Sequence, residues 1–396
     1  MTAAIEHSAD LTPKGHRWAR TRHPWVYADD VASVSGANGD VVRVTFEGRV
    51  LGTAFLGTRS KIALRWIERS DAPREPDPSF WRDRMRMALE RRVVLARSTD
   101  AYRIVHDAAD GIPGLVADRY GPVVVLQTSI LGTERLLPVF TEAAAELVGA
   151  KTVILRNDAA IREKEGLPRE VKVVPGASPG RVWVHDAGPR GWIEYPVDPE
   201  TGQKTGAFLD QRENRWEASR FARGRVLDAF SYQGLFALHA SRAADTVVAV
   251  DTSEPALELC RLAAKQNGFA NIETVRRNVF DYLKDAAEAG ERFDEVILDP
   301  PAFAKSRKDL PAAERAYREI NRRAMSLLPP GGTLVTCSCS YNLSEEAFID
   351  ILRGAATDAR ADLQVVERRT QAADHPVLLN HPESSYLKCV VLERRG

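Results

Sequence analysis

The sequence predicts an α/β protein of several domains: a small all-β domain, an α+β segment, and a doubly wound, mostly parallel sheet. The chain has 396 residues, enough for two or three domains of ordinary size. A proline-rich stretch at 71–78 separates a region of short strands and glycine turns from the rest. From residue 197 onward, short apolar runs alternate with helical stretches, as in a parallel sheet with both faces covered.

The first two segments are predicted from alternation, helical spacing and turn residues. Strand candidates before the linker are 41–46, 50–56 and 62–67. After the linker we expect a helix over 80–97 with Ser79 as its N-cap. A compact α+β segment follows, ending near residue 195, with strands at 102–106, 115–118, 123–128 and 152–156 and a second helix at 134–147.

The last segment supplies the parallel sheet. Its strand candidates are 225–228, 246–250, 272–275, 295–298 and 333–337, and its clearest helices are 254–266 and 312–327. The stretch 386–393 reads as an added edge or antiparallel strand. We therefore expect three domains, at 1–72, 73–195 and 196–396.

The composition argues against several classes of protein, among them membrane-spanning, secreted and zinc-binding proteins. Lys+Arg and Asp+Glu are both 55, which argues against a generally basic nucleic-acid coat but leaves room for a local basic face. There is no apolar run long enough to cross a membrane and no signal-peptide pattern at the start. The four cysteines lack the paired spacing of a zinc site. These features predict a cytoplasmic, reduced protein with no membrane partner and no metal.

Two acidic residues follow neighbouring strands, where ligands of doubly wound sheets bind. Asp228 ends one strand, and Asp251 ends the next, at about the offset of a carboxylate that grips ribose hydroxyls. The loop after Asp228 has one glycine, Gly234, and lacks the glycine fingerprint that a dinucleotide pyrophosphate requires. This disfavours an NAD-dependent oxidoreductase and suits S-adenosylmethionine, whose positive charge a carboxylate can face. The alternative is that each acid merely ends its strand or caps the next helix.

A third acid and a pair of cysteines point to the reaction. Asp299 follows a buried strand and is stiffened by two prolines, although a purely structural turn would look the same. One strand further on stand Cys337 and Cys339. Carbon 5 of cytosine becomes nucleophilic only after a thiolate adds at carbon 6, so a cysteine here suits cytosine-5 methylation. Residues i and i+2 share one strand face, so the spacing does not choose between the two cysteines. Cys260 and Cys389 read as core residues.

Together these segments resemble the RlmI-type 23S rRNA (cytosine-5)-methyltransferases along nearly the whole chain. The motifs that carry the resemblance are Arg22-His-Pro-Trp-Val-Tyr27, Asp110-Gly-Ile-Pro-Gly-Leu115, Arg162-Glu-Lys-Glu-Gly166, the stretch 201–212, Asp228-Ala-Phe-Ser-Tyr232, Val250-Asp-Thr-Ser253, Leu298-Asp-Pro-Pro-Ala-Phe303, Ser338-Cys-Ser340, Ala373-Asp-His-Pro-Val377 and Tyr386-Leu-Lys388.

The resemblance implies an RNA-binding PUA domain, a central α+β domain and a Rossmann-like class I methyltransferase domain. It implies that Cys339, the cysteine flanked by serines, is the nucleophile and that Asp299 faces the target base. Around the cofactor it implies Phe208, Asp210 and Gln211 closing over it, Phe230 and Gly234 lining it, Asp251 and Ser253 at the ribose, and Asn278 at the adenine. The family also commonly forms homodimers.

Three positions depart from the family pattern. Leu235 stands where a second glycine is usual, Asn278 where an acid is usual, and Ala302 where many RNA cytosine-5 enzymes carry a second cysteine for enzyme release. The family also works with one cysteine, so the last departure limits the mechanism without refuting it.

A basic, aromatic cluster near the start suits RNA contact, with a solvated face as the alternative. It comprises His16, Arg17, Trp18, Arg20, Arg22, His23 and Trp25. Further basic candidates are the arginines of 82–92, for which a solvated helix face is the simpler explanation, and Lys305, Arg307 and Lys308. The expected substrate is 23S rRNA or a large-subunit precursor. Two rival functions are a purine-nitrogen rRNA methyltransferase, which needs no thiol, and a non-catalytic RNA-binding assembly factor.

Overall fold

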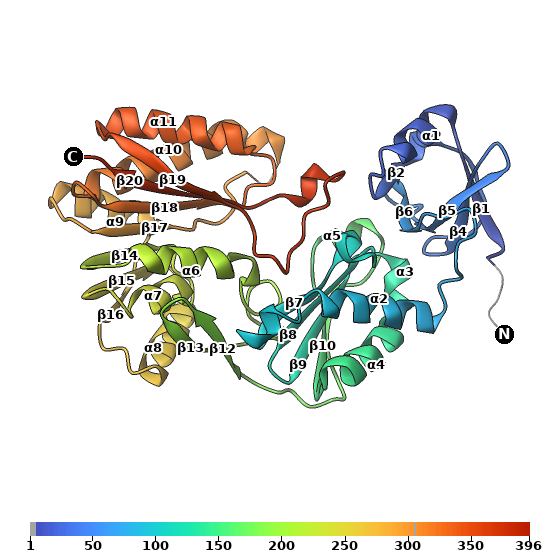
Figure 1. Ribbon diagram of the computed structural model, residues 1–396, viewed down its shortest axis with the longest axis horizontal. Coiled ribbons are helices and arrows are strands. Elements are labelled where there is room, and N and C mark those ends of the chain that lie inside the picture. The colour runs from blue at the N-terminus through green and yellow to red at the C-terminus, as the bar shows by residue number, and fades with distance from the viewer. Residues whose placement is uncertain (1–4, 305) are drawn as a thin grey trace. The chain divides into compact units, whose positions relative to one another are not determined.

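The computed structural model describes residues 5–304 and 306–396, so Lys305 lies outside the described residues. The chain divides into two compact units (Figure 1). Unit 1 contains Met1–Val184, Val197–Leu209 and Asp374–Ser384, and unit 2 contains His185–Pro196, Asp210–Ala373 and Ser385–Gly396. Each unit is described by itself.

The N-terminal part of unit 1 is a six-stranded sheet in the order β2-β6-β5-β4-β1-β3. Its elements are β1 (His7–Leu11), α1 (Pro13–Arg20), β2 (Trp25–Tyr27), β3 (Val31–Val34), β4 (Val41–Phe46), β5 (Arg49–Leu56) and β6 (Ile62–Glu68). The three predicted strands are found as β4, β5 and β6. Helix α1 was not predicted because its sequence is short and polar. It begins after Thr12, whose hydroxyl accepts the Gly15 N–H at 2.9 Å.

The second part of unit 1 is a five-stranded sheet in the order β11-β10-β9-β8-β7. Its elements are α2 (Pro78–Glu90), β7 (Ala101–His106), β8 (Leu115–Tyr120), β9 (Val123–Thr128), α3 (Leu131–Glu134), α4 (Leu137–Val148), β10 (Thr152–Asn157), α5 (Ile161–Lys164) and β11 (Glu170–Val174). The predicted N-cap Ser79 was wrong. Asp77 caps α2 by accepting the Phe80 N–H at 2.8 Å, with Pro78 at the first helical position. The helix also ends at Glu90, earlier than expected.

Unit 2 is built on a seven-stranded sheet in the order β16-β15-β14-β17-β18-β20-β19. Its strands are β14 (Arg225–Ala229), β15 (Thr246–Asp251), β16 (Ile272–Arg276), β17 (Glu295–Leu298), β18 (Thr333–Ser338), β19 (Leu363–Arg369) and β20 (Lys388–Arg394). The first five are parallel, and β20 inserts antiparallel between β18 and β19. The predicted fold, a mostly parallel sheet with an added antiparallel strand, is confirmed.

Three helices cover each face of this sheet (Figure 1). The helices of one face are α9 (Val279–Glu288), α10 (Leu310–Leu327) and α11 (Glu345–Ala359), and those of the other are α6 (Arg212–Phe221), α7 (Leu235–Ala240) and α8 (Glu254–Gln266). The strand order reverses at β14, where the chain turns first toward β15 and later toward β17. Ligands of such sheets bind beyond the strand ends at this reversal.

The remaining elements are short. A two-stranded ribbon pairs β12 (Val182–Gly188) with β13 (Gly191–Val197). Single 3₁₀ turns lie at Ala28–Asp30, Leu95–Arg97, Asp107–Asp110, Leu209–Gln211, Arg307–Asp309 and Pro382–Ser384. Within the residues that the structure describes, none of the helices combines the length and the apolar character needed to pass through a lipid bilayer.

Candidate active site

Asp228 sits at the end of β14, next to the strand-order reversal, and is fully buried. Its Oδ2 accepts the Ala237 N–H at 2.9 Å, whereas its buried Oδ1 has no hydrogen-bond partner among the described residues. Burial raises the pKa of Asp228 to about 8, and the charges of Asp299 and Asp251 add to the rise. A buried carboxylate with an unused oxygen fits a cationic ligand, such as the ammonium or sulfonium group of S-adenosylmethionine.

The unliganded protein should lose stability as pH rises because of Asp228. Its folded pKa lies above the unfolded value, so between about pH 4 and pH 8 the folded state keeps a proton that the unfolded state has lost. The free energy of unfolding then falls with pH, by up to about 1.4 kcal/mol per unit from this group. Asp228→Asn cannot ionise and should lack this slope. Urea unfolding of both proteins from pH 5 to pH 8 measures the difference, and equal slopes would contradict the assignment.

The loop between β14 and α7 has an unusual backbone that Asp251 holds in place. Phe230, Tyr232 and Gly234 all have positive φ, at 64°, 48° and 71°. The Tyr232 N–H donates to Asp251 Oδ2 at 2.8 Å, and the Ser253 N–H donates to Asp251 Oδ1 at 2.8 Å. A carboxylate has about four acceptor positions, so Asp251 can still accept from ribose hydroxyls. The half-buried Asp251 carboxylate is thereby fixed in orientation beside the cofactor loop.

Gly234 is required by packing inside the domain. A Cβ at this position would lie 2.3 Å from Cys260 Sγ on α8 and would need the same positive φ. Gly234→Ala should therefore cost about 1–2 kcal/mol for the backbone and about 1–3 kcal/mol more for the overlap. Gly290→Ala is the matched control, because its φ is 70° and its Cβ would meet no atom within 4 Å.

Chemical denaturation of the two alanine variants tests this account. We expect Gly290→Ala to show only the backbone cost, and the double change Gly234→Ala with Cys260→Ala to recover part of the larger loss. Equal destabilisation by Gly234→Ala and Gly290→Ala would show that contact with Cys260 is unimportant.

Asn278 and Ser253 both lie at helix starts on the same edge of the sheet. Exposed Asn278 is the N-cap of α9 and accepts the Phe280 N–H at 2.8 Å through Oδ1. Half-buried Ser253 is the N-cap of α8 and accepts the Ala256 N–H at 3.4 Å. The capping bonds by themselves explain structurally why each of these two side chains is present.

Asp299 follows β17 and is oriented by a chain of amides. Its Oδ1 accepts from Gln211 Nε2 at 2.8 Å, and Gln211 Oε1 accepts from Asn214 Nδ2 at 2.6 Å. Asn214 lies on α6, and both amide side chains are buried. The structure therefore gives Gln211 a contact with Asp299, which the sequence did not predict. Asp299 is partly exposed, so its carboxylate can meet a substrate.

Asp210 and Phe208 have contacts of their own, Asp210 within unit 2 and Phe208 within unit 1. Buried Asp210 accepts the Tyr386 hydroxyl at 2.7 Å and, through its main-chain oxygen, the Ala372 N–H at 2.8 Å. Phe208 belongs to unit 1, where the Lys204 ammonium lies 4.5 Å from its ring centroid. The structure thus assigns Asp210 to packing near the C-terminal strand.

Only one of the four cysteines is accessible. Cys337 is fully buried, and a hydrogen bond with Cys389, together with burial, raises its pKa well above the usual range. Burial raises the pKa of Cys260 to about 12. Cys339 follows β18 and is half-buried, with its Sγ 3.9 Å from the carbonyl oxygen of Pro300, the residue after Asp299. Burial therefore distinguishes the accessible Cys339 from the inaccessible Cys337, which their spacing did not.

The two serines beside Cys339 fix its direction. Ser338 Oγ donates to the Tyr317 hydroxyl at 3.0 Å, and Ser340 Oγ lies 3.0 Å from the same oxygen. Ser340 Oγ also accepts the Ala304 N–H at 3.2 Å. Because neighbouring residues of an extended chain point to opposite sides, anchoring both serines to α10 turns Cys339 away from that helix. Sequence reasoning did not identify Tyr317, because it lies on a helix far from Cys339 in the chain.

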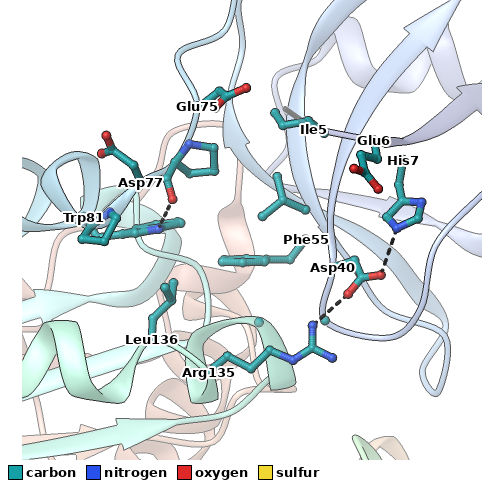
Figure 2. Close-up of a pocket in the computed structure, with 15 residues that line it drawn as sticks. Ile5, Glu6, His7, Asp40, Phe55, Glu75, Asp77, Trp81, Arg135 and Leu136 are labelled. Carbon is teal, nitrogen blue, oxygen red and sulfur yellow. Dashed lines mark hydrogen bonds and ion pairs between the residues drawn. The ribbon is translucent and has the colours of Figure 1, made fainter. Parts of the chain in front are cut away.

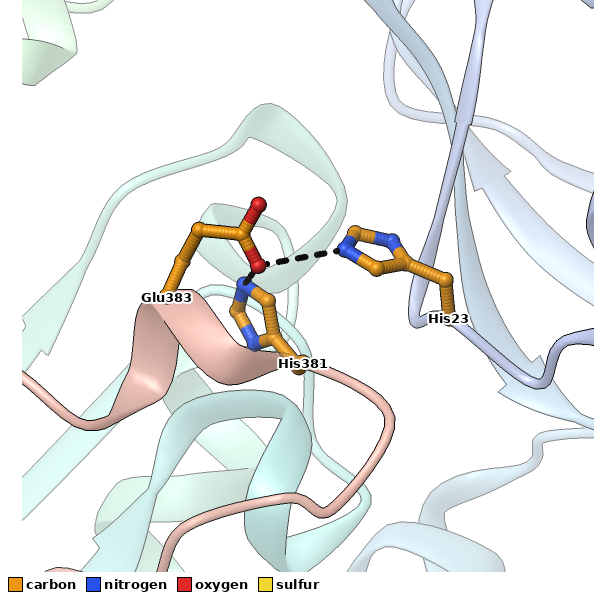
Figure 3. Close-up of side chains that lie close together, drawn as sticks. All are labelled: His23, His381 and Glu383. Atoms are coloured by element: carbon orange, nitrogen blue, oxygen red, sulfur yellow. Dashed lines mark ion pairs between the residues drawn. The ribbon is translucent and has the colours of Figure 1, made fainter.

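Unit 1 brings together three residues of types that can bind a metal, and the tautomer of one of them does not suit a metal site. Figure 3 shows the imidazole rings of His23 and His381 turned toward the Glu383 carboxylate, with Nε2–Oε2 distances of 3.5 and 3.9 Å. His23 Nδ1 accepts the Trp25 N–H at 3.2 Å, which places the proton of neutral His23 on Nε2. A metal would need that nitrogen deprotonated, with Nδ1 donating instead. His23 is also buried, so it is not part of an exposed basic surface. Of the predicted basic cluster, Arg17, Arg20 and Arg22 are exposed.

Unit 1 also contains a cavity of about 630 Å³, floored by Phe55, Trp81 and Leu136 (Figure 2). Glu6, Glu75 and other acidic groups line it, and Asp40 is already paired with Arg135 at 2.8 Å. This acidic lining is unsuited to RNA phosphates. Two of the arginines at 82–92 already have acidic partners: Arg82 on α2 pairs with Glu146 at 3.1 Å, and Arg92, just after that helix, is buried against Asp110 at 2.6 Å.

Comparisons with known proteins agree with the two kinds of domain. A family model for a PUA-like domain matches residues 10–69, and one for an S-adenosylmethionine-dependent methyltransferase matches 184–390. The crystal structure of SMU.776 complexed with SAH has the same fold, with a TM-score of 0.81 and 20% identity, covering 98% of this chain and 99% of that chain.

Curated relatives cover almost the whole chain. Ribosomal RNA large subunit methyltransferase I of Aeromonas hydrophila is 37% identical over 383 residues, which is 94% of this chain and 96% of the relative. The protein of the same name from Photobacterium profundum is 38% identical over 380 residues, 93% of this chain and 94% of the relative. The chain therefore belongs to the ribosomal RNA large subunit methyltransferase I family of S-adenosylmethionine-dependent methyltransferases.

Proposed function

We propose that this protein methylates carbon 5 of a cytidine in 23S rRNA through a transient covalent bond to Cys339. The observation that carries the proposal is the placement of Cys339, the accessible cysteine, beside the loop that presents Asp299. The names of the relatives support a large-subunit rRNA substrate. A thiol at this position favours carbon methylation, because a purine nitrogen is already nucleophilic and needs none.

The Cys339 thiolate adds to carbon 6, forming an S–C6 bond and moving the C5=C6 electron pair toward carbon 5 and N3. Asp299, held by Gln211, accepts a hydrogen bond from the N4 amino group and favours a proton at N3 as negative charge develops there. S-adenosylmethionine supplies an electrophilic methyl group, which carbon 5 takes. A base then removes the carbon 5 proton, and the thiolate leaves carbon 6.

The target cytidine must leave its stack to reach these residues, at a cost of about a few kcal/mol and least in single-stranded RNA. We assign Asp228 to the positive charge of the cofactor, Asp251 and Ser253 to the ribose and Asn278 to the adenine. Phe230 and Gly234 would line the cofactor, with Phe208, Asp210 and Gln211 closing over it.

We assign RNA binding to the PUA-like domain, with its exposed Arg17, Arg20 and Arg22. The three-domain division at 72/73 and 195/196, cytoplasmic location and assembly as a homodimer are part of the same proposal. RNA affinity that falls steeply with salt would support the basic contact, and salt-independent binding would contradict it.

Product analysis tests the proposed reaction. Total RNA from cells with and without the gene is compared by bisulfite sequencing, and nucleosides of the affected rRNA are identified by mass spectrometry. We expect loss of one 5-methylcytidine in 23S rRNA. Loss of a methylated purine would establish the rival nitrogen methyltransferase. Unchanged methylation, with no binding of S-adenosylmethionine in calorimetry, would instead establish a non-catalytic assembly factor.

A further inference from the structure

We propose that Lys388 is a positioning residue that holds Cys339 as a thiolate. The proposal rests on the role of Cys339 in the proposed function. The sequence showed Lys388 only as part of a family motif and left the means of activating the nucleophile open.

Lys388 is the first residue of β20 and lies opposite Ser338 in the antiparallel pair with β18. Its side chain is buried, with 6% of the residue exposed. Its Nζ donates to the carbonyl oxygen of Ser340 at 2.7 Å and to that of Tyr386 at 2.9 Å. The ammonium is therefore fixed against the peptide group that follows Cys339, at the end of the strand that carries the nucleophile.

The contacts of Tyr386 and of the serines make this position rigid. The Tyr386 hydroxyl donates to buried Asp210, and Tyr317 anchors the serines on both sides of Cys339. An ammonium has three donors, and the two carbonyl bonds use only two of them. Neutral carbonyls leave a buried positive charge without a counter-charge, which is costly unless an anion lies nearby.

The pKa of Lys388 is consistent with the Cys339 thiolate as the anion near its ammonium group. Burial lowers the pKa of Lys388 to about 8, and the negative charges of Cys339 and Glu345 oppose this shift. The coupling is mutual, so an ammonium that is favoured by the thiolate favours the thiolate equally. Tyr317 on the packed helix α10 also interacts with Cys339, and its pKa is raised mainly by burial. A neutral Tyr317 supplies no positive charge, whereas the Lys388 ammonium does.

The pH dependence of Cys339 alkylation by iodoacetamide tests the proposal without requiring methyl transfer. Modification of the Cys339 peptide is followed by mass spectrometry in the full-length protein, with Cys339→Ala as background. In the wild-type protein we expect half-maximal reactivity clearly below the free-thiol value of about pH 8.5. A wild-type value at or above it would overturn the proposal, whatever any variant does.

Two substitutions separate charge from structure. Lys388→Gln keeps amide donors for the two carbonyls but removes the charge, and should lower alkylation at pH 7 about tenfold by raising the midpoint about one unit. Lys388→Arg keeps the charge and should stay near the wild-type profile. A Lys388→Gln profile equal to wild type, in a variant with unchanged melting temperature, would show that Lys388 only bridges the carbonyls.

These outcomes are distinct from failure of the proposed function. If Cys339→Ala still methylates RNA, the covalent mechanism is refuted, but the pH profile of Cys339 alkylation in the wild-type and Lys388 variants still tests the role of Lys388. If Cys339→Ala is inactive but Lys388→Gln leaves that profile unchanged, only the positioning role of Lys388 is refuted.

Discussion

Replacing Cys339 by alanine is expected to lower methyl transfer by a factor of about 10⁴ or more, the scale on which enzymes lose rate with their nucleophile. Without the thiolate, carbon 5 of cytosine stays unreactive toward the methyl donor. The half-buried Cys339 thiol lies 3.9 Å from the Pro300 carbonyl oxygen, a weak contact, so replacing the small side chain should hardly alter the fold. The rate is measured with radiolabelled S-adenosylmethionine and large-subunit rRNA.

Cys337→Ala is the matched control, because Cys337 lies on β18, the strand that Cys339 follows. Cys337 is fully buried beside Cys389, so its removal should lower stability by about 1 kcal/mol and leave the rate within a few-fold of wild type. Calorimetry should show wild-type cofactor affinity for both variants. An active Cys339→Ala protein, or an inactive but folded Cys337→Ala protein, would mean that the nucleophile has been misassigned.

Asp299→Ala is expected to lower the turnover number by about 10²–10³, the cost of removing one oriented group from the reacting centre. The carboxylate is presented between β17 and two prolines and is aimed by the Gln211 amide at 2.8 Å. Its loss removes the acceptor for the cytosine amino group while charge develops on the ring. Single-turnover kinetics at saturating RNA isolates this step from binding.

Gln211→Leu separates the effect of orienting the Asp299 carboxylate from the effect of removing it. It removes the donor to Asp299 but keeps the carboxylate, so the turnover number should fall about tenfold, less than in Asp299→Ala. A normal turnover number with a large rise in KM for RNA in Asp299→Ala would indicate that Asp299 only binds the substrate.

The sequence predicted the fold and the sheet edge of the site because both follow from local patterns. Asp228, Asp251 and Asp299 each end an apolar run, and parallel strands bring such ends together. Gln211 and Asp299 are 88 residues apart, and no local pattern relates them. The contacts of Tyr317 and Lys388 with the residues around Cys339 likewise arise only when α10 and β20 pack against β18.

One local prediction was wrong for a physical reason, and one predicted residue has a structural role that the sequence did not show. The linker helix starts at Pro78 because an aspartate before a proline is a better helix start than the serine that follows it. That Gly234 lines the cofactor stays a prediction, and the structure adds that a Cβ there would overlap Cys260 on the buried side. The contact with Cys260 depends on neighbours in space that the sequence pattern does not show.

Reaction with rRNA fragments containing 5-fluorocytidine tests the covalent mechanism most directly. Fluorine at carbon 5 cannot leave as a proton does, so methyl transfer should leave the enzyme bonded to carbon 6. We predict a denaturation-resistant protein–RNA adduct, in the presence of S-adenosylmethionine, whose cross-linked peptide contains Cys339. Wild-type and Cys337→Ala proteins should form it, and Cys339→Ala should not. An enzyme that methylates normal RNA but forms no adduct, or forms it through another residue, would contradict the account.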